Sequence, residues 1–184
     1  MFDEDSYNPA AQDSALTPAQ QQTLREAKSL LENGKAGQAA PLFARLAEIL
    51  ASAGQPRRAA NMHAQAAQTF AQNRNETGTL TQARAALTLF VQYKMEQRAQ
   101  FFYTAIRREL TKRGMPATAE TLAKEFSTRV TTQPVPTAPP AQPIDRLPAN
   151  CPNCGAPVRT EAARWIDKNS LECAYCGTPI RPVA

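Results

Sequence analysis

Residues 34–54 read GKAGQAAPLFARLAEILASAG, an apolar stretch with a glycine at each end. Within it, Ala39, Phe43, Leu46 and Leu50 are spaced by four, three and four residues. That spacing places the four side chains on one face of an α-helix, because such a helix turns once every ~3.6 residues. The stretch therefore predicts one amphipathic helix between two glycine turns.

The same stripe recurs every twenty residues along residues 17–130. Four positions of the repeat carry mostly apolar or small side chains, the fourth being the most mixed: Leu30, Leu50, Phe70, Phe90, Leu110 and Val130; Ala39, Ala59, Thr79, Ala99 and Ala119; Leu46, Ala66, Ala86, Ile106 and Phe126; Phe43, His63, Ala83, Tyr103 and Ala123. Glycine returns between the units at Gly34, Gly54 and Gly114. An internal repeat of this kind is typical of a helical array rather than of an irregular domain.

Start signals agree with this division of the chain. Residues 17–20 read Thr-Pro-Ala-Gln, which combines an N-cap threonine, a proline at the first helical position and a capping-box glutamine. Pro56 and Pro116 open their units in the same way. We predict six helices, near 17–33, 37–53, 56–72, 77–93, 96–113 and 116–130.

Short turns make neighbouring helices antiparallel, which gives three helix hairpins that bury their apolar faces by stacking. Ala39 followed by Phe43, with Gly34 five residues earlier, resembles the second helix of tetratricopeptide-type repeats. The resemblance covers most of residues 17–130 and implies an open, TPR-like helical-repeat domain. A hairpin here takes about 40 residues instead of about 34, and the Trp and Tyr usual in the first helix are missing. A compact six-helix bundle is the alternative.

All four cysteines of the chain lie in its last 34 residues, as Cys151-x₂-Cys154 and Cys173-x₂-Cys176, each pair followed by glycine. Two such pairs offer the four soft thiolate ligands that a tetrahedral Zn²⁺ ion prefers. Disulfides, iron binding and redox use are the alternatives. The acidic start of the chain has no apolar run of the kind found in signal peptides or membrane spans. We therefore expect a reducing, cytoplasmic location and no membrane partner.

The two Cys-x-x-Cys-Gly knuckles resemble those of the zinc-ribbon families, over about residues 149–184. The resemblance implies a small antiparallel β-hairpin and one structural Zn²⁺ held by all four cysteines. Residues 163–173 read as strand, turn and strand. Trp165, the only tryptophan, lies on the first of these strands and is expected to cover the metal site, or else to dock on a partner. Four protein ligands leave no open coordination position, which argues against a catalytic metal.

A proline-rich stretch separates the helices from the cysteines. Residues 131–150 hold six prolines and almost no charge, which predicts a semi-extended linker. Such a linker lets the ribbon move independently, so we expect few fixed contacts between the ribbon and the helices. The expected organisation is an acidic, disordered N-terminus at 1–16, a helical-repeat domain at 17–130, the linker at 131–150 and the ribbon at 151–184.

Charge is unevenly spread along the chain. Residues 1–13 have a net charge of −4, and residues 14–130 have a net charge of +8. The densest basic group is Arg107, Arg108, Lys112 and Arg113, which suggests a face for an acidic protein partner. Cations near a helix C-terminus also stabilise the helix itself, which is the structural alternative.

No catalytic motif accompanies these features. His63 is the only histidine and lies on the apolar stripe, where a packed side chain is the simpler interpretation. The chain has neither a glycine-rich phosphate loop nor a recognisable nucleophile motif. We expect a non-enzymatic zinc-binding adaptor that binds a protein. The alternative is a nucleic-acid-associated regulator that uses the basic helices, although a metallated ribbon of net charge near −1 adds little to such binding.

Overall fold

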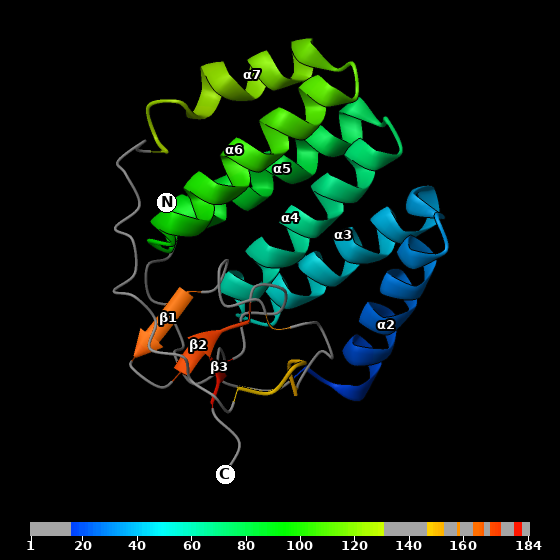
Figure 1. Ribbon diagram of the computed structural model, residues 1–184, viewed down its shortest axis with the longest axis vertical. Helices are drawn as coiled ribbons and strands as arrows, with labels where there is room; N and C mark the ends of the chain where they lie inside the picture. The colour runs from blue at the N-terminus through cyan, green and yellow to red at the C-terminus, as the bar shows by residue number, and fades with distance from the viewer. Residues whose placement is uncertain are drawn as a thin grey trace.

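The computed structural model describes residues 16–130, 147–152, 158, 164–167, 170–173 and 179–181. These residues are mostly α-helical (Figure 1). The helices are α2 (Pro18–Glu32), α3 (Ala36–Ser52), α4 (Pro56–Gln72), α5 (Glu76–Gln92), α6 (Glu96–Lys112) and α7 (Pro116–Phe126). The mostly α class is confirmed, and the packing of neighbouring helices is compatible with a helical-repeat domain. All helix bounds but the end of α7 lie within one residue of those predicted from the repeat.

Helix α7 ends four residues before the predicted position at 130. Its C-cap is Ser127, and the backbone continues through turns to Val130. Hydroxyl side chains at 127 and 128 compete for backbone hydrogen bonds and weaken helix propensity there. Val130 is nevertheless only 2% exposed, so the repeat correctly predicted its place in the core.

One turn geometry joins every consecutive pair of helices. The turn has three residues, and the middle one has a left-handed backbone: φ is 74° at Gly34, 70° at Gly54, 54° at Arg74, 52° at Lys94 and 78° at Gly114. At the first turn, the N–H of Lys35 donates to the carbonyl of Leu30 at 2.8 Å, and that of Gly34 donates to Leu31 at 3.0 Å. The other four turns contain the same pair of bonds, the Schellman motif. The twenty-residue repeat is therefore one helix plus one three-residue turn.

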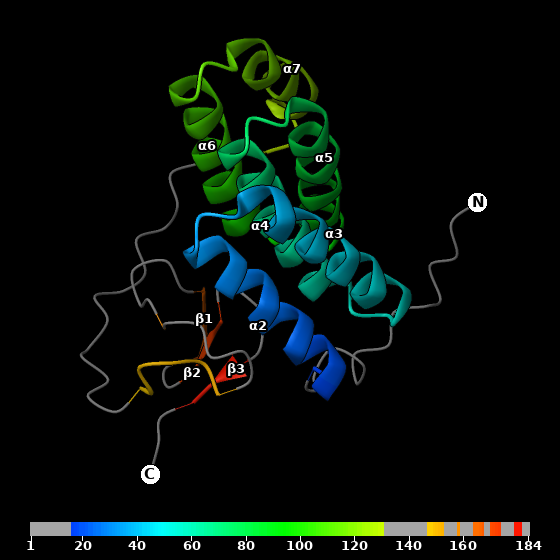
Figure 2. The same ribbon diagram turned by 90° about the vertical axis from the view of Figure 1, so that its right-hand side faces the viewer.

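Helix α4 is the central element of the helical part, between α3 and α5 (Figures 1 and 2). Its alanines divide between two buried clusters. Ala59 and Ala66 pack with residues of α2 and α3, whereas Ala60 and Ala67 pack with residues of α5, α6 and α7. Side chains this small let neighbouring helices approach α4 on both sides. Helix α4 thus contributes side chains to both clusters.

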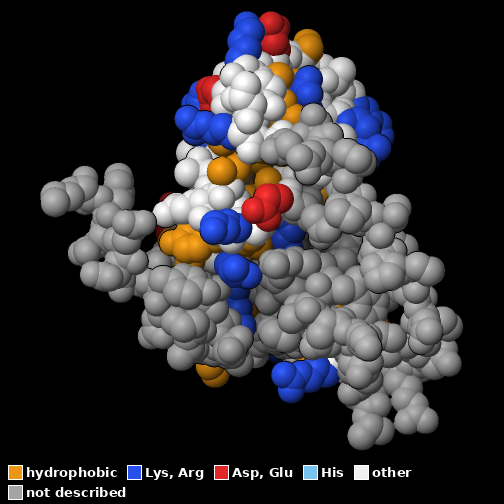
Figure 3. Space-filling view, turned by 90° about the vertical axis from the view of Figure 1, so that its left-hand side faces the viewer, with side chains coloured by type: hydrophobic (Ala, Val, Ile, Leu, Met, Phe, Trp, Pro, Cys, Tyr) orange, Lys and Arg blue, Asp and Glu red, His pale blue; other side chains and the backbone are white. Residues whose placement is uncertain are grey.

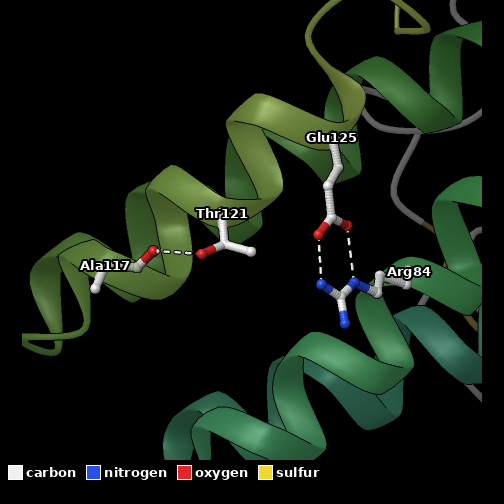
Figure 4. Close-up of polar contacts among 4 residues, drawn as sticks. All are labelled: Arg84, Ala117, Thr121 and Glu125. Atoms are coloured by element: carbon white, nitrogen blue, oxygen red, sulfur yellow. Dashed lines mark hydrogen bonds and ion pairs between the residues drawn. The ribbon is translucent and has the colours of Figure 1, made fainter.

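Polar contacts tie the second hairpin to the third. Arg84 of α5 and Glu125 of α7 form a two-bond ion pair (Figure 4), in which Nε donates to Oε2 at 2.8 Å. Near the other end of α7, the hydroxyl of Thr118 donates to Oε2 of Glu76 at 2.6 Å. The Arg84 guanidinium also holds the pKa of the Glu125 carboxyl below its usual range. These contacts orient α7 on α5, two helices away along the chain.

The described C-terminal residues include a three-stranded antiparallel sheet of β1 (Arg164–Asp167), β2 (Ser170–Glu172) and β3 (Pro179–Ile180), in that order. Leu171 lies opposite Trp165 on one side and Ile180 on the other. In Figure 1 the sheet lies below α4 and α6, near their N-terminal ends.

The C-terminal segment packs against the helices. Cys151, Leu171, Cys173 and Ile180 are buried in the same cluster as side chains of α2, α3 and α4. Each of the four is at most 2% exposed. The proline-rich linker predicts few fixed contacts between the ribbon and the helices, whereas the structure buries these four residues in one cluster with helical side chains.

Candidate functional site

Two of the four predicted metal ligands lie within the described residues. Cys173 directly follows β2, and Cys151 follows Asn150 in the segment that leads from the linker. Both are 2% exposed and belong to one buried cluster. Cys154 and Cys176 lie outside the described residues. No group of three or more metal-ligating side chains is found among the residues that the structure covers.

A guanidinium joins Cys173 to the helices. Arg98, in the first turn of α6, donates from Nη2 to the backbone carbonyl of Cys173 at 3.2 Å. Its Nη1 donates to Oδ1 of Asn61 on α4 at 2.5 Å. One planar group therefore bridges α4, α6 and the residue after β2.

The N-terminal end of α4 is strongly basic and largely buried. Arg58 is 2% exposed and donates from Nη1 to Oε1 of Gln55 at 3.0 Å. Asn61 is 4% exposed, and its Nδ2 has no hydrogen-bond partner within the described parts of the chain. The sequence has no Asp or Glu between Glu48 and Glu76. Buried cations are tolerated where polar or anionic groups complement them, so this end of α4 is suited to an electronegative neighbour.

The predicted basic face on α6 is only partly a free surface. Arg108 and Lys112 are exposed. Arg107 is also exposed, and its guanidinium carbon lies 5.2 Å from the ring centroid of Tyr103. That distance is typical of a cation–π contact. On the face that Figure 3 shows, Lys and Arg are more prominent than Asp and Glu.

Arg113 has a structural role. It is the C-cap of α6 and donates from Nη1 to the carbonyl of Gln72, the last residue of α4, at 3.1 Å. Its Nε donates to Oε1 of Glu109. Carbonyls at a helix C-terminus lack intrahelical partners, so this bond completes the end of α4.

A large aromatic side chain lies beside the exposed cations of α6. Phe101 is 65% exposed, whereas its neighbours Phe102 and Tyr103 are each 4% exposed. Positions 101, 108 and 112 differ by seven and four residues, which places them on one side of α6. No pattern in the sequence distinguishes Phe101 from Phe102 and Tyr103, and only its exposure in the structure does so.

His63 is a packed side chain, as the repeat suggested. It is 9% exposed on α4, with Nδ1 2.6 Å from Oε1 of Gln82 on α5. Burial lowers the pKa of His63 below its ordinary value, and this effect exceeds the opposite effects of the Gln82 hydrogen bond and of Glu48. The neutral ring therefore donates Nδ1–H to the amide oxygen.

Trp165 lies in β1, with Leu171 as its partner on β2.

Among the described residues, no helix is both long and apolar enough to cross a lipid bilayer.

Comparison with protein-family models, with curated proteins and with solved structures finds no match to this chain.

Proposed function

We propose that this chain is a non-enzymatic, zinc-binding adaptor of the cytoplasm. Its TPR-like helical-repeat domain binds a protein partner, and its C-terminal segment is a zinc ribbon with a structural role. The observation that carries the proposal is the outer side of α6, where Phe101 is 65% exposed in line with two exposed cations. A large exposed aromatic residue is a common anchor of protein interfaces.

The outer side of α6, defined by Phe101, Arg108 and Lys112, suits an acidic segment that carries one apolar side chain. The three residues span about 16 Å along the helix axis, at ~1.5 Å per residue. An apolar side chain can pack on the Phe101 ring while carboxylates pair with the two cations. Arg107, over the Tyr103 ring, lies next to this surface and adds to its positive potential.

A structural zinc ion fits the donor set of the C-terminal segment. Cys151 and Cys173 each begin one Cys-x-x-Cys pair, and both are buried in one cluster. Together with Cys154 and Cys176 they would offer four thiolates, which close a tetrahedral site. One Zn²⁺ ion would then stabilise a segment too small to hold its fold by burial alone.

Partner binding is tested with a labelled acidic peptide that contains one leucine among Asp and Glu residues, by fluorescence anisotropy. Phe101→Ser and Arg108→Glu are each expected to weaken binding about tenfold. Arg45→Glu is the matched control, because Arg45 is exposed on α3 and the change in charge is the same. Equal affinities for wild type and both α6 variants would contradict the proposal.

The same variants distinguish the nucleic-acid alternative, which the exposed Arg108 and Lys112 favour. Binding to nonspecific duplex DNA should then fall steeply with salt, and Arg108→Glu should weaken it while Phe101→Ser should not. Sub-micromolar affinity for DNA near physiological salt would favour the nucleic-acid regulator over the adaptor.

The zinc ribbon is tested by metal analysis of protein purified without added metal. We expect about one Zn²⁺ per chain and its loss in Cys154→Ser. Wild-type protein without metal and without reactive thiols would instead indicate disulfides.

A further inference from the structure

Arg98 connects Cys173 to the helical domain through bonds that no local pattern predicts. Its two donors reach Asn61 on α4 and the carbonyl of Cys173, residues 37 positions before it and 75 positions after it. The guanidinium is planar, so the two acceptors hold it in one orientation. Any movement of the residue after β2 away from α6 must break this bond.

Asn61 positions Arg98. Its side chain is 4% exposed, and its carbonyl oxygen accepts the 2.5 Å bond from Nη1 of Arg98. The amide nitrogen makes no hydrogen bond to any described residue. Burial of an amide nitrogen without a hydrogen-bond partner costs free energy of folding. Among the described residues, the hydrogen bond from Arg98 is what offsets this cost at Asn61.

The N-terminal end of α4, which Arg98 of α6 contacts through Asn61, favours an anionic neighbour, whereas α6 itself has Glu96 in the same first turn as Arg98. Arg57 and Arg58 lie on the first turns of α4, and α4 itself contains no acidic residue. Four thiolates around one Zn²⁺ ion carry a net charge of −2. A positive guanidinium that also donates to the backbone of a ligand residue stabilises such a centre and orients the ligand.

We propose that Arg98, positioned by Asn61, is an outer-shell residue of the zinc site that holds Cys173 on the helical domain. Zinc binding and docking of the ribbon are then coupled, and each strengthens the other. The inference rests on the proposed zinc ribbon. It assigns to α4 and α6 a role in metal affinity that lies outside the cysteine segment itself.

The experiment follows the transfer of zinc from the full-length protein to a chromophoric chelator. Removal of outer-shell partners typically lowers metal affinity about 10–100-fold. We therefore expect Arg98→Met to release zinc at least about tenfold faster than wild type. Arg98→Lys keeps the charge but not the planar guanidinium, so its rate of zinc release should lie between those of wild type and Arg98→Met. Arg107→Met, on the exposed side of the same helix, is the control and should release zinc at the wild-type rate.

A second variant keeps the test decisive if Arg98→Met folds poorly. Asn61→Ala leaves the ribbon and Arg98 intact but removes the acceptor that orients the guanidinium, and it should also release zinc faster, by about threefold or more. Far-ultraviolet circular dichroism of each variant checks that the helices persist.

The outcomes separate the two proposals. Wild-type release rates in zinc-loaded Arg98→Met and Asn61→Ala would overturn the role of Arg98 and leave the zinc ribbon in place. A wild-type protein that binds no zinc would overturn both.

Discussion

At the scale of single residues, the middle position of two of the five turns carries a residue that disfavours the backbone conformation of the turn. The backbone is left-handed at Gly34, Gly54 and Gly114, where glycine accepts it without strain. Arg74 and Lys94 adopt the same conformation with a side chain attached. An L-residue in this region costs roughly 1–2 kcal/mol. The turn is thus imposed by the repeat even where the residue disfavours it.

Replacement of Arg74 or Lys94 by glycine should therefore stabilise the protein. We expect each substitution to raise the free energy of unfolding by about 0.5–1 kcal/mol, after the greater entropy of glycine in the unfolded chain is allowed for. Urea denaturation measures the change as a shift of midpoint at constant slope. Gly54→Ala is the opposite control: its new Cβ would meet no atom within 4 Å, so a loss of about 1 kcal/mol would come from the backbone alone.

The buried His63 predicts a dependence of stability on pH. Its pKa in the folded protein is below the ordinary value of 6.5, so the unfolded chain takes up the proton first as the pH falls. The contribution of His63 to the free energy of unfolding is therefore fully present above pH 6.5 and decreases as the pH falls from there toward the folded-state pKa of His63. The total decrease is about 1.4 kcal/mol for each pH unit that separates the two pKa values.

The measurement is urea denaturation of wild type and His63→Phe between pH 7.5 and pH 5. Phenylalanine is the residue at the same repeat position in Phe43, which is 2% exposed. The substitution should remove the His63 contribution and flatten the decline on acidification. Identical pH profiles would show that the ring titrates alike in the folded and unfolded chain.

At the scale of elements, a close crossing holds α5 on α4. A Cβ added at Gly78 of α5 would lie 2.7 Å from Cδ1 and 2.8 Å from Cγ of Phe70 on α4. Such distances are below van der Waals contact and would force a rigid ring to move. Glycine is therefore needed here for space rather than for backbone freedom.

Gly78→Ala should destabilise the protein although alanine is the better helix former. Overpacking costs about 1–3 kcal/mol and exceeds the gain in propensity of about 1 kcal/mol. Thermal denaturation in a Phe70→Leu background should show a smaller loss, because the ring is then gone. Gly37→Ala on α3 is the matched control: its Cβ would face only the end of the exposed Asn73 side chain, at 3.1 Å, and stability should be unchanged or raised.

At the scale of the whole molecule, we expect metal removal to affect the two buried clusters differently. The cluster of α2 and α3 includes Cys151 and Cys173, whereas none of the described residues in the cluster of α5, α6 and α7 is a cysteine. If the cysteines bind zinc, chelation should loosen the first cluster more than the second. Amide exchange measured by mass spectrometry should then quicken most in α2 and α3 and least in α7. Equal acceleration in all helices would indicate one cooperative unit.

The sequence alone predicts what depends on neighbours a few residues apart. Helix and turn bonds join residues three to five positions apart, so the stripe through Phe43, the capping box at Thr17 and the glycine turns suffice to predict six helices and most of the core. The paired cysteines likewise suggest a metal through short spacings. These patterns are readable because the interactions behind them are local.

Tertiary structure alone decides which surfaces are exposed and which distant residues meet. Phe101, Phe102 and Tyr103 are similar in sequence, and only the packing of α6 on its neighbours leaves Phe101 exposed. Arg113 completes α4, and Arg98 reaches Cys173, across 41 and 75 positions of the chain. Burial and long-range hydrogen bonds depend on where whole elements come to lie, and no periodicity within one element contains that information.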